Sequence, residues 1–209
     1  MRAEWAWPAA ALAALLALPT PATAQQRPSF PPTRDVAVTY RISIAAPGVP
    51  HAFEMRFSAR TERARLDADL PAYVLVDLKA HRASIVMDRL GVMVDTPPEA
   101  GLEQALVLED GKRFIRRGSD VVAGLRCTIW EVVADAASGT ACVTADGVVL
   151  RASGHDRQGR AGSLEATRVT YGRQPEALFV PPPNVQRIEL GAAGGPALTG
   201  ILGRLPAHP

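Results

Sequence analysis

Hydrophobic and polar residues alternate along most of the chain, and residues 36–44 are the clearest case. There, apolar side chains occupy every second position from Val36 to Ile44, with smaller or polar residues between them. Because successive side chains of a strand point to opposite faces, this pattern predicts a strand with one buried and one solvated face. Similar but shorter patterns lie at residues 53–58, 63–67 and 82–88.

The rest of the chain continues in the same way, with one interruption. Residues 73–78 are apolar on both faces, which is typical of a central strand. Further strands are predicted at residues 92–94, 113–116, 125–133, 141–145, 147–153 and 163–171. Residues 97–110 break the alternation, and the spacing of Leu102, Ala105 and Leu106 predicts a short helix.

Turn residues separate these segments about every ten positions, as in an antiparallel meander. About ten strands in one sheet must curl, split or close. The sequence therefore predicts a mainly β protein with a single curved antiparallel sheet of about ten strands and one or two short helices. We expect the helix or a loop to cross the concave face.

The two ends of the chain differ from this middle part. Residues 1–24 read as a signal peptide, with Arg2, an apolar run at 9–18 and the Ala22-Thr23-Ala24 motif. An uncleaved anchor is the alternative, although the apolar run is short of the ~20 residues of a spanning helix. We expect cleavage near Ala24 and a periplasmic or secreted protein, with no transmembrane segment after cleavage.

The predicted domain organisation follows from these ends. Residues 25–34 are polar and Pro-rich and predict a flexible leader, and residues 35–190 form the curved β-sheet domain. Residues 191–209 are rich in Gly, Ala and Pro and predict a mobile tail.

Cys127 and Cys142 are the only cysteines, so only one pairing exists. They lie in two strand-like segments joined by a turn-rich stretch at residues 136–139, and a hairpin there could place them side by side. In an oxidising compartment we expect a disulfide, with two buried thiols as the alternative. A metal site is not expected, because two cysteines without nearby histidines supply too few ligands.

Composition and net charge restrict the classes of function that the protein could have. Apolar residues make up 47% and charged residues 21%, which is typical of a globular protein. The net charge of +2 is too small to indicate nucleic-acid binding. The densest basic patch is Lys112, Arg113, Arg116 and Arg117, which could meet an acidic partner or anionic headgroups, or could be a solvated face.

Few residues suggest catalysis. Ser153, His155 and Asp156 are the residue types of a hydrolase triad, but neighbours on one short segment cannot easily adopt its geometry. Asp67 and Asp69 could hold a cation, although Asp is also common in turns. We expect no catalytic residue, no metal and no cofactor.

The apolar strand faces are the main candidate for binding. Phe53, Met55, Phe57, Ile85, Met87 and Met93 supply long, adaptable side chains that could line a curved sheet. Such a concavity could hold an acyl chain. The alternative is a core packed against the predicted helix.

Three stretches, read in order, carry a family resemblance: residues 73–77 with 85–88 and 92–94, residues 124–130 with 142–148, and residues 175–181. This succession resembles an uncharacterised family of exported bacterial β proteins, a domain of unknown function. That family is similar to periplasmic lipoprotein carriers of the LolA/LolB type. The resemblance covers roughly residues 36–190, which is nearly all of the mature domain.

The resemblance implies a half-barrel whose apolar concave side shields acyl chains without catalysis. The chain departs from the carriers in its small predicted helix content and in lacking a lipid-attachment Cys. Our first hypothesis is an exported, non-enzymatic protein that binds a lipid or a lipidated partner on the concave face. The alternative is an envelope scaffold with a filled core and no ligand, and a hydrolase using His155 or Asp67 and Asp69 ranks third.

Overall fold

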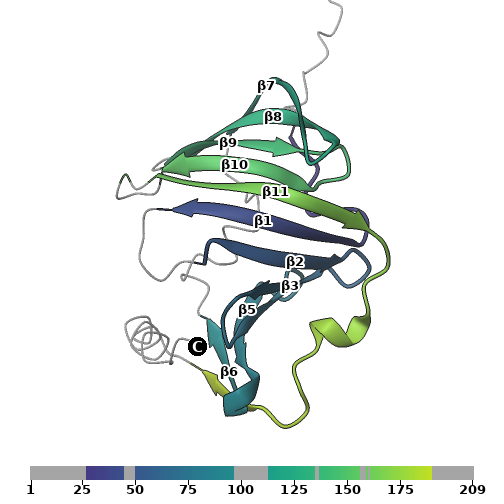
Figure 1. Ribbon diagram of the computed structural model, residues 1–209, viewed down its shortest axis with the longest axis vertical. Coiled ribbons are helices and arrows are strands. Elements are labelled where there is room, and N and C mark those ends of the chain that lie inside the picture. The colour runs from purple at the N-terminus through teal and green to yellow at the C-terminus, as the bar shows by residue number, and fades with distance from the viewer. Residues whose placement is uncertain are drawn as a thin grey trace, which may run out of the picture.

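The computed structural model describes residues 27–44, 50–96, 113–134, 137–155, 159 and 161–189. Over these residues the chain forms one strongly curved sheet of twelve strands, with two short 3-10 turns (Figure 1). The predicted mainly β, single curved sheet is confirmed. The predicted signal peptide, the helix at 97–110 and the tail at 191–209 lie outside the described residues.

The first six strands form one half of the sheet and follow each other as antiparallel neighbours. They are β1 (Val36–Ile44), β2 (Ala52–Ser58), β3 (Arg63–Ala68), β4 (Tyr73–Asp77), β5 (Arg82–Met87) and β6 (Val92–Thr96). The 3-10 turn η1 (Asp88–Leu90) joins the last two. It ends at Gly91, whose φ of 62° is a left-handed conformation that glycine adopts without strain.

The remaining strands build the other half and both ends. They are β7 (Arg113–Val122), β8 (Leu125–Ala134), β9 (Ala137–Val143), β10 (Val149–His155), β11 (Ala161–Tyr171) and β12 (Gln186–Glu189). The strand order is β12-β6-β5-β4-β3-β2-β1-β11-β10-β9-β8-β7, so β1 lies in the middle and pairs with β11. The chain therefore does not run as one simple meander, and β12 pairs with β6 in parallel.

One predicted turn proves to be part of a strand. Gly139 belongs to the turn-rich stretch at 136–139, but it lies in β9 opposite Val132 of β8 and Gly154 of β10. A Cβ at Gly139 would collide with the carbonyl oxygen of Ser153. This glycine therefore permits a close approach of two strands.

The core consists of three clusters of buried apolar side chains. The largest joins β1 to β5 with residues of β7 to β11, and its least exposed members are Val36, Val38, Phe57, Val76, Ala83, Cys127, Val148 and Leu150. A second cluster contains Tyr73, Leu75, Val86 and Met93, and a third contains Phe114, Trp130, Ala141 and Val143.

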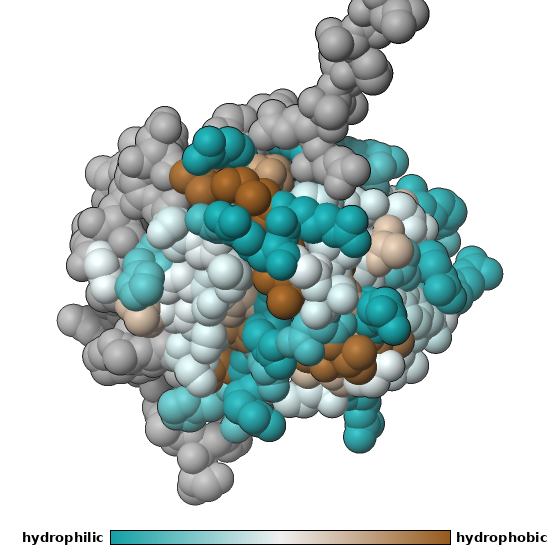
Figure 2. All heavy atoms as spheres, turned by 90° about the horizontal axis from the view of Figure 1, so that it is seen from above, coloured by the Kyte–Doolittle hydropathy of each residue, from teal (hydrophilic) through white to brown (hydrophobic). Residues whose placement is uncertain are grey.

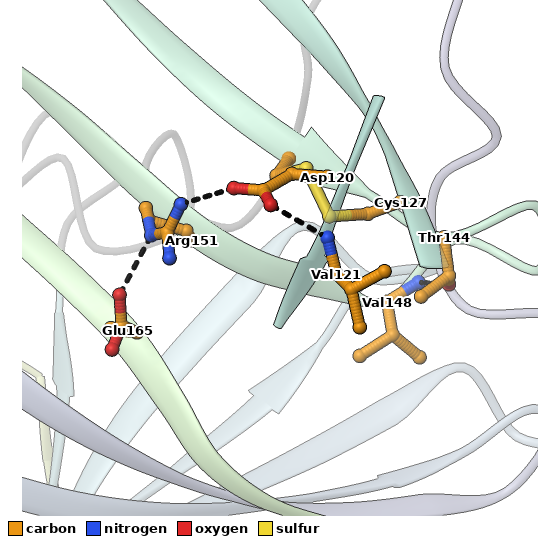
Figure 3. Close-up of a disulfide and its surroundings, with 8 residues drawn as sticks. Asp120, Val121, Cys127, Thr144, Val148, Arg151 and Glu165 are labelled. Atoms are coloured by element: carbon orange, nitrogen blue, oxygen red, sulfur yellow. Dashed lines mark hydrogen bonds and ion pairs between the residues drawn. A yellow bond between two sulfur atoms is a disulfide. The ribbon is translucent and has the colours of Figure 1, made fainter. Parts of the chain in front are cut away.

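The predicted disulfide between Cys127 and Cys142 is confirmed. It joins β8 to β9, with the two Cα atoms 5.3 Å apart, and both side chains are buried. Beside it, the Arg151 guanidinium bridges Asp120 and Glu165 and so links β7, β10 and β11 (Figure 3).

Residues 31–34, in the segment predicted as a leader, contact the sheet. Pro32 is buried, and the Thr33 amide donates to the Asp146 carbonyl at 2.9 Å. The Arg34 guanidinium lies 4.4 Å from the ring centre of Tyr171, a cation–π contact. These contacts attach the segment to the loop before β10 and to the end of β11.

Candidate ligand-binding face

The strand register places apolar side chains in continuous rows across one face of β1 to β6. In an antiparallel sheet, residues directly opposite each other share a face. One row crosses seven strands from β1 to β12 and comprises Val38, Met55, Leu66, Val74, Ile85, Val94 and Ile188. No polar residue interrupts this row across the seven strands.

A parallel row on the same face is closed to solvent. It comprises Val36, Phe57, Ala64, Val76 and Ala83, all of which are buried. Phe57 is 2% exposed and Ala83 0%. This end of the face is a packed core.

The face becomes more accessible toward the other end of these strands. Phe53, Leu66, Val74, Ile85 and Val92 are only partly buried, and we call these five residues the accessible apolar group. They come from five consecutive strands, β2 to β6, and lie on one face. An apolar ligand that contacts this face would meet them first, because their side chains still have area to lose from water.

The structure brings together five of the six residues predicted to bind a ligand. Phe53, Met55 and Phe57 lie on this face of β2, and Ile85 and Met87 lie on the same face of β5. Phe53 and Ile85 belong to the accessible apolar group, whereas Met55, Phe57 and Met87 are buried.

Met93 lies on the opposite face. It stands opposite Val86 and packs with Tyr73, Leu75 and the loop residue Val185. It therefore belongs to a different cluster and is not brought together with the other five.

The chain itself covers that opposite face through the segment between β11 and β12. The 3-10 turn η3 (Glu176–Phe179) lies against β3 and buries Phe179. The Arg65 guanidinium stacks 3.6 Å from the ring centre of Tyr73, and its Nη1 donates to the Leu178 carbonyl at 3.4 Å. These contacts cover the Met93 side of β3 and β4, and Val185 of the same segment packs against the cluster that contains Met93.

Tyr40 marks where the apolar face of β1 and β2 meets the strands beyond β11. Its ring stacks on Phe53 with the ring centres 5.0 Å apart, and its hydroxyl donates to the Val149 carbonyl at 2.7 Å. Burial raises the pKa of the Tyr40 hydroxyl, because the charged phenolate would have to leave water. This hydrogen bond fixes the position of the uncharged Tyr40 side chain on which the Phe53 ring stacks.

The polar candidates do not converge on one site. Asp67 is occupied by Arg65 at 2.8 Å and by Arg56 at 3.1 Å, while Asp69 is exposed beyond the end of β3. His155 is exposed opposite Ala161, and Ser153 forms a hydrogen bond with Thr140. In the part of the chain that the structure describes, no cluster of three or more His, Cys, Asp or Glu side chains could hold a metal ion.

A pocket of about 400 Å³ lies elsewhere on the surface. Residues 29–33 line it together with Ala59 and Glu62, which follow β2. Phe53 lies near the opposite end of β2, so this pocket is not continuous with the accessible apolar group.

Leu66 and Val74 were not among the residues predicted to bind. Leu66 alternates with Arg65 and Asp67, so its strand pattern indicated a buried position, but only the register shows that it lies between Met55 and Val74.

In the described ranges, no helix has the length and hydropathy needed to cross a membrane.

Comparisons with known proteins give structural likeness only. No family model and no curated protein matches the sequence. A chain of the complex of Pseudomonas aeruginosa MucA and MucB has a TM-score of 0.49 at 14% identity, covering 75% of this chain and 58% of that one. The present chain therefore spans less than two thirds of the length of that chain.

Two further solved structures belong to the kind of family that the sequence resembles. A LolA superfamily protein from Nitrosomonas europaea has a TM-score of 0.40 at 10% identity and covers 71% of this chain and 91% of its own. A DUF1329 family protein from Desulfovibrio piger has a TM-score of 0.42 at 13% identity, covering 71% and 90%. The likeness to these proteins concerns the fold alone.

Proposed function

We propose that this chain is an exported, non-enzymatic protein that binds an apolar ligand, either a lipid or a lipidated partner, on the face formed by β1 to β6. The observation that carries the proposal is the uninterrupted apolar row across seven strands, with Leu66, Val74 and Ile85 still partly accessible at its centre. The disulfide between Cys127 and Cys142 supports export, because such bonds persist in oxidising compartments.

The chemistry of binding would be hydrophobic contact with little polar recognition. Each partly exposed aliphatic side chain that a ligand covers contributes in proportion to the apolar area removed from water, about 25 cal/mol per Å². The polar side chains on the other face of β2 and β3 pair with each other, as Arg56 does with Asp67. We therefore expect a binder that selects for an alkyl chain.

An envelope scaffold without a ligand is the second candidate. The closed row that includes Val36, Phe57 and Ala83 favours it, because these side chains already have the burial of an ordinary core. The two functions differ in whether the accessible apolar group gains a ligand.

Photo-crosslinking tests the proposal. The protein, purified from periplasm, is incubated with a fatty acid that carries a diazirine on its alkyl chain, irradiated and digested, and labelled residues are identified by mass spectrometry. We expect labels at Leu66, Val74 or Ile85, competed by unlabelled fatty acid. Labels confined to Leu75 and Val86, which lie on the other face of the same strands, or no competed labelling, would contradict the proposal.

A matched pair of variants gives a second readout. Ile85→Glu places a charge at the centre of the accessible apolar group, whereas Leu90→Glu changes a 56% exposed residue of η1 outside it. Binding of a fluorescent acyl probe should be lost only in the first variant, with thermal melts showing that both are folded. If Ile85→Glu does not fold, the crosslinking map still decides.

A further inference from the structure

The strand β7 forms the end of the sheet opposite β12, and no strand of the described residues pairs with its outer edge (Figure 1). It has ten residues, and among the described residues β8 is the only strand that pairs with it. Arg116, Arg117, Gly118 and Ser119 are all exposed. An edge strand turns every second N–H and C=O outward, so its backbone can accept another strand.

This edge carries the densest basic patch of the sequence. Arg117 is held by Glu131 of β8, with Nε and Oε2 2.6 Å apart. Arg113 and Arg116 are exposed, and within the described ranges no carboxylate pairs with either. Two positive charges on the edge are therefore not neutralised by the sheet. Figure 2 looks onto this end of the molecule and shows hydrophilic side chains around smaller apolar patches.

The two charges project to opposite sides of the strand. Arg116 stands opposite Trp130 and shares a face with Phe114, whereas Arg113 stands opposite Val133 and shares the other face with Ile115. A bilayer surface is flat and would be met best by charges on one side. An added strand has alternating side chains of its own and can offer a carboxylate on each face.

We infer that the outer edge of β7, from Arg113 to Arg116, accepts an extended acidic segment of a partner protein as an additional β-strand. Backbone hydrogen bonds to the edge hold the segment, and its acidic side chains lie opposite Arg113 and Arg116. The register shift between Arg116 and Gly118 interrupts the regular ladder of β7, and pairing with β8 resumes at Gly118. A partner strand that stays in register with Arg113–Arg116 is therefore short. A second copy of this chain does not fit, because its own arginines would face Arg113 and Arg116.

This inference is independent of the proposed lipid function, because it uses neither the accessible apolar group nor the opposite face of β1 to β6. The arginines also have a simpler use, since charges on an edge strand discourage self-association. The experiment separates these uses by testing the backbone and the charges individually.

The test uses the purified full chain and a fluorescent peptide of about eight residues, the length of a short strand. The peptide is rich in Val and Thr and has two glutamates three positions apart, matching Arg113 and Arg116. Fluorescence anisotropy at low salt should show saturable binding. The same peptide with alternate amides N-methylated, and one with glutamine for glutamate, should not bind.

Variants of the protein assign the contact. Arg113→Glu and Arg116→Glu should each weaken binding roughly tenfold, which is about 1.4 kcal/mol. Arg168→Glu is the matched control, because Arg168 is exposed in β11 near the middle of the sheet. It should bind as the wild type does, and thermal melts should show that all three variants are folded.

Three outcomes would overturn the inference. Equal binding of the N-methylated peptide would mean that charge alone acts, without an added strand. Binding to vesicles of anionic phospholipid but not to the peptide would assign the arginines to a membrane surface. If neither binds, the arginines only protect the edge, and the Arg113→Glu and Arg116→Glu variants should then self-associate in sedimentation.

Discussion

Opening the disulfide between Cys127 and Cys142 should destabilise the domain by an amount that the structure allows to be worked out. The two residues are 15 positions apart, and closing such a loop in the unfolded chain is worth about 3 kcal/mol in the chain-entropy model. Reduction leaves both sulfur atoms in place, so comparing oxidised and reduced protein isolates the cross-link. Replacing both residues with alanine should cost more than reduction, because Cys127 and Cys142 are 2% and 4% exposed and their removal leaves a cavity.

Guanidinium unfolding with and without reductant measures this difference. Trp130 is a convenient probe because it is buried in β8, one of the two cross-linked strands, and becomes exposed on unfolding. We expect the reduced protein to unfold at lower denaturant, with a free energy of unfolding lower by about 3 kcal/mol. Curves that coincide within about 0.5 kcal/mol would refute the reasoning, since the disulfide would then not reduce the conformational freedom of the unfolded chain as expected.

Two further predictions concern ionisable groups. The raised pKa of Tyr40, caused by burial, means that the unfolded state loses the phenol proton first, so stability should fall as the pH rises above 10.0. Tyr40→Phe should remove that part of the alkaline decline but cost about 1–3 kcal/mol at neutral pH, because the Val149 carbonyl loses its donor; unfolding curves at several pH values check both. Partial burial of Asp77 tends to raise its pKa, but hydrogen bonds from the Ala80 amide and the Arg63 guanidinium outweigh burial and lower the pKa. The charged carboxylate therefore stabilises the folded state at neutral pH, and this stabilisation should be lost as the pH falls below 3.8. Asp77→Asn should flatten the acid side of the stability profile, and an unchanged profile would contradict this assignment.

The strands that alternate most clearly could be predicted from the sequence because one face is buried and the other meets water. β1 and β2 are such strands, with buried Val36, Val38, Met55 and Phe57. β7 was predicted only as residues 113–116, although it extends to Val122. Residues 116–119 are exposed at an edge, so no hydrophobic period indicates the strand there. β12 was missed for a similar reason, since it has four residues and only one is apolar.

The candidate site could be predicted in part. Alternation within one strand shows which residues share a face of the sheet, but it does not carry across a turn. Ile85 and Met87 lie two residues apart in β5 and share a face, as expected. Met93 follows Met87 by six residues, yet the turn η1 makes Val92 the residue opposite Met87, so Met93 faces the other way. The pairing of β1 with β11, and of β6 with β12, depends on contacts between distant segments that no local pattern encodes.

Native mass spectrometry of the protein, purified from periplasm without detergent, tests most directly whether this chain binds an apolar ligand. We expect an additional mass, released by organic solvent and identified as a lipid or a lipidated peptide, which rebinds on titration. The Ile85→Glu variant should lack that mass, and the Leu90→Glu control should retain it. A bare chain that takes up neither fatty acid nor phospholipid on titration would contradict the central proposal and favour a scaffold with a filled core.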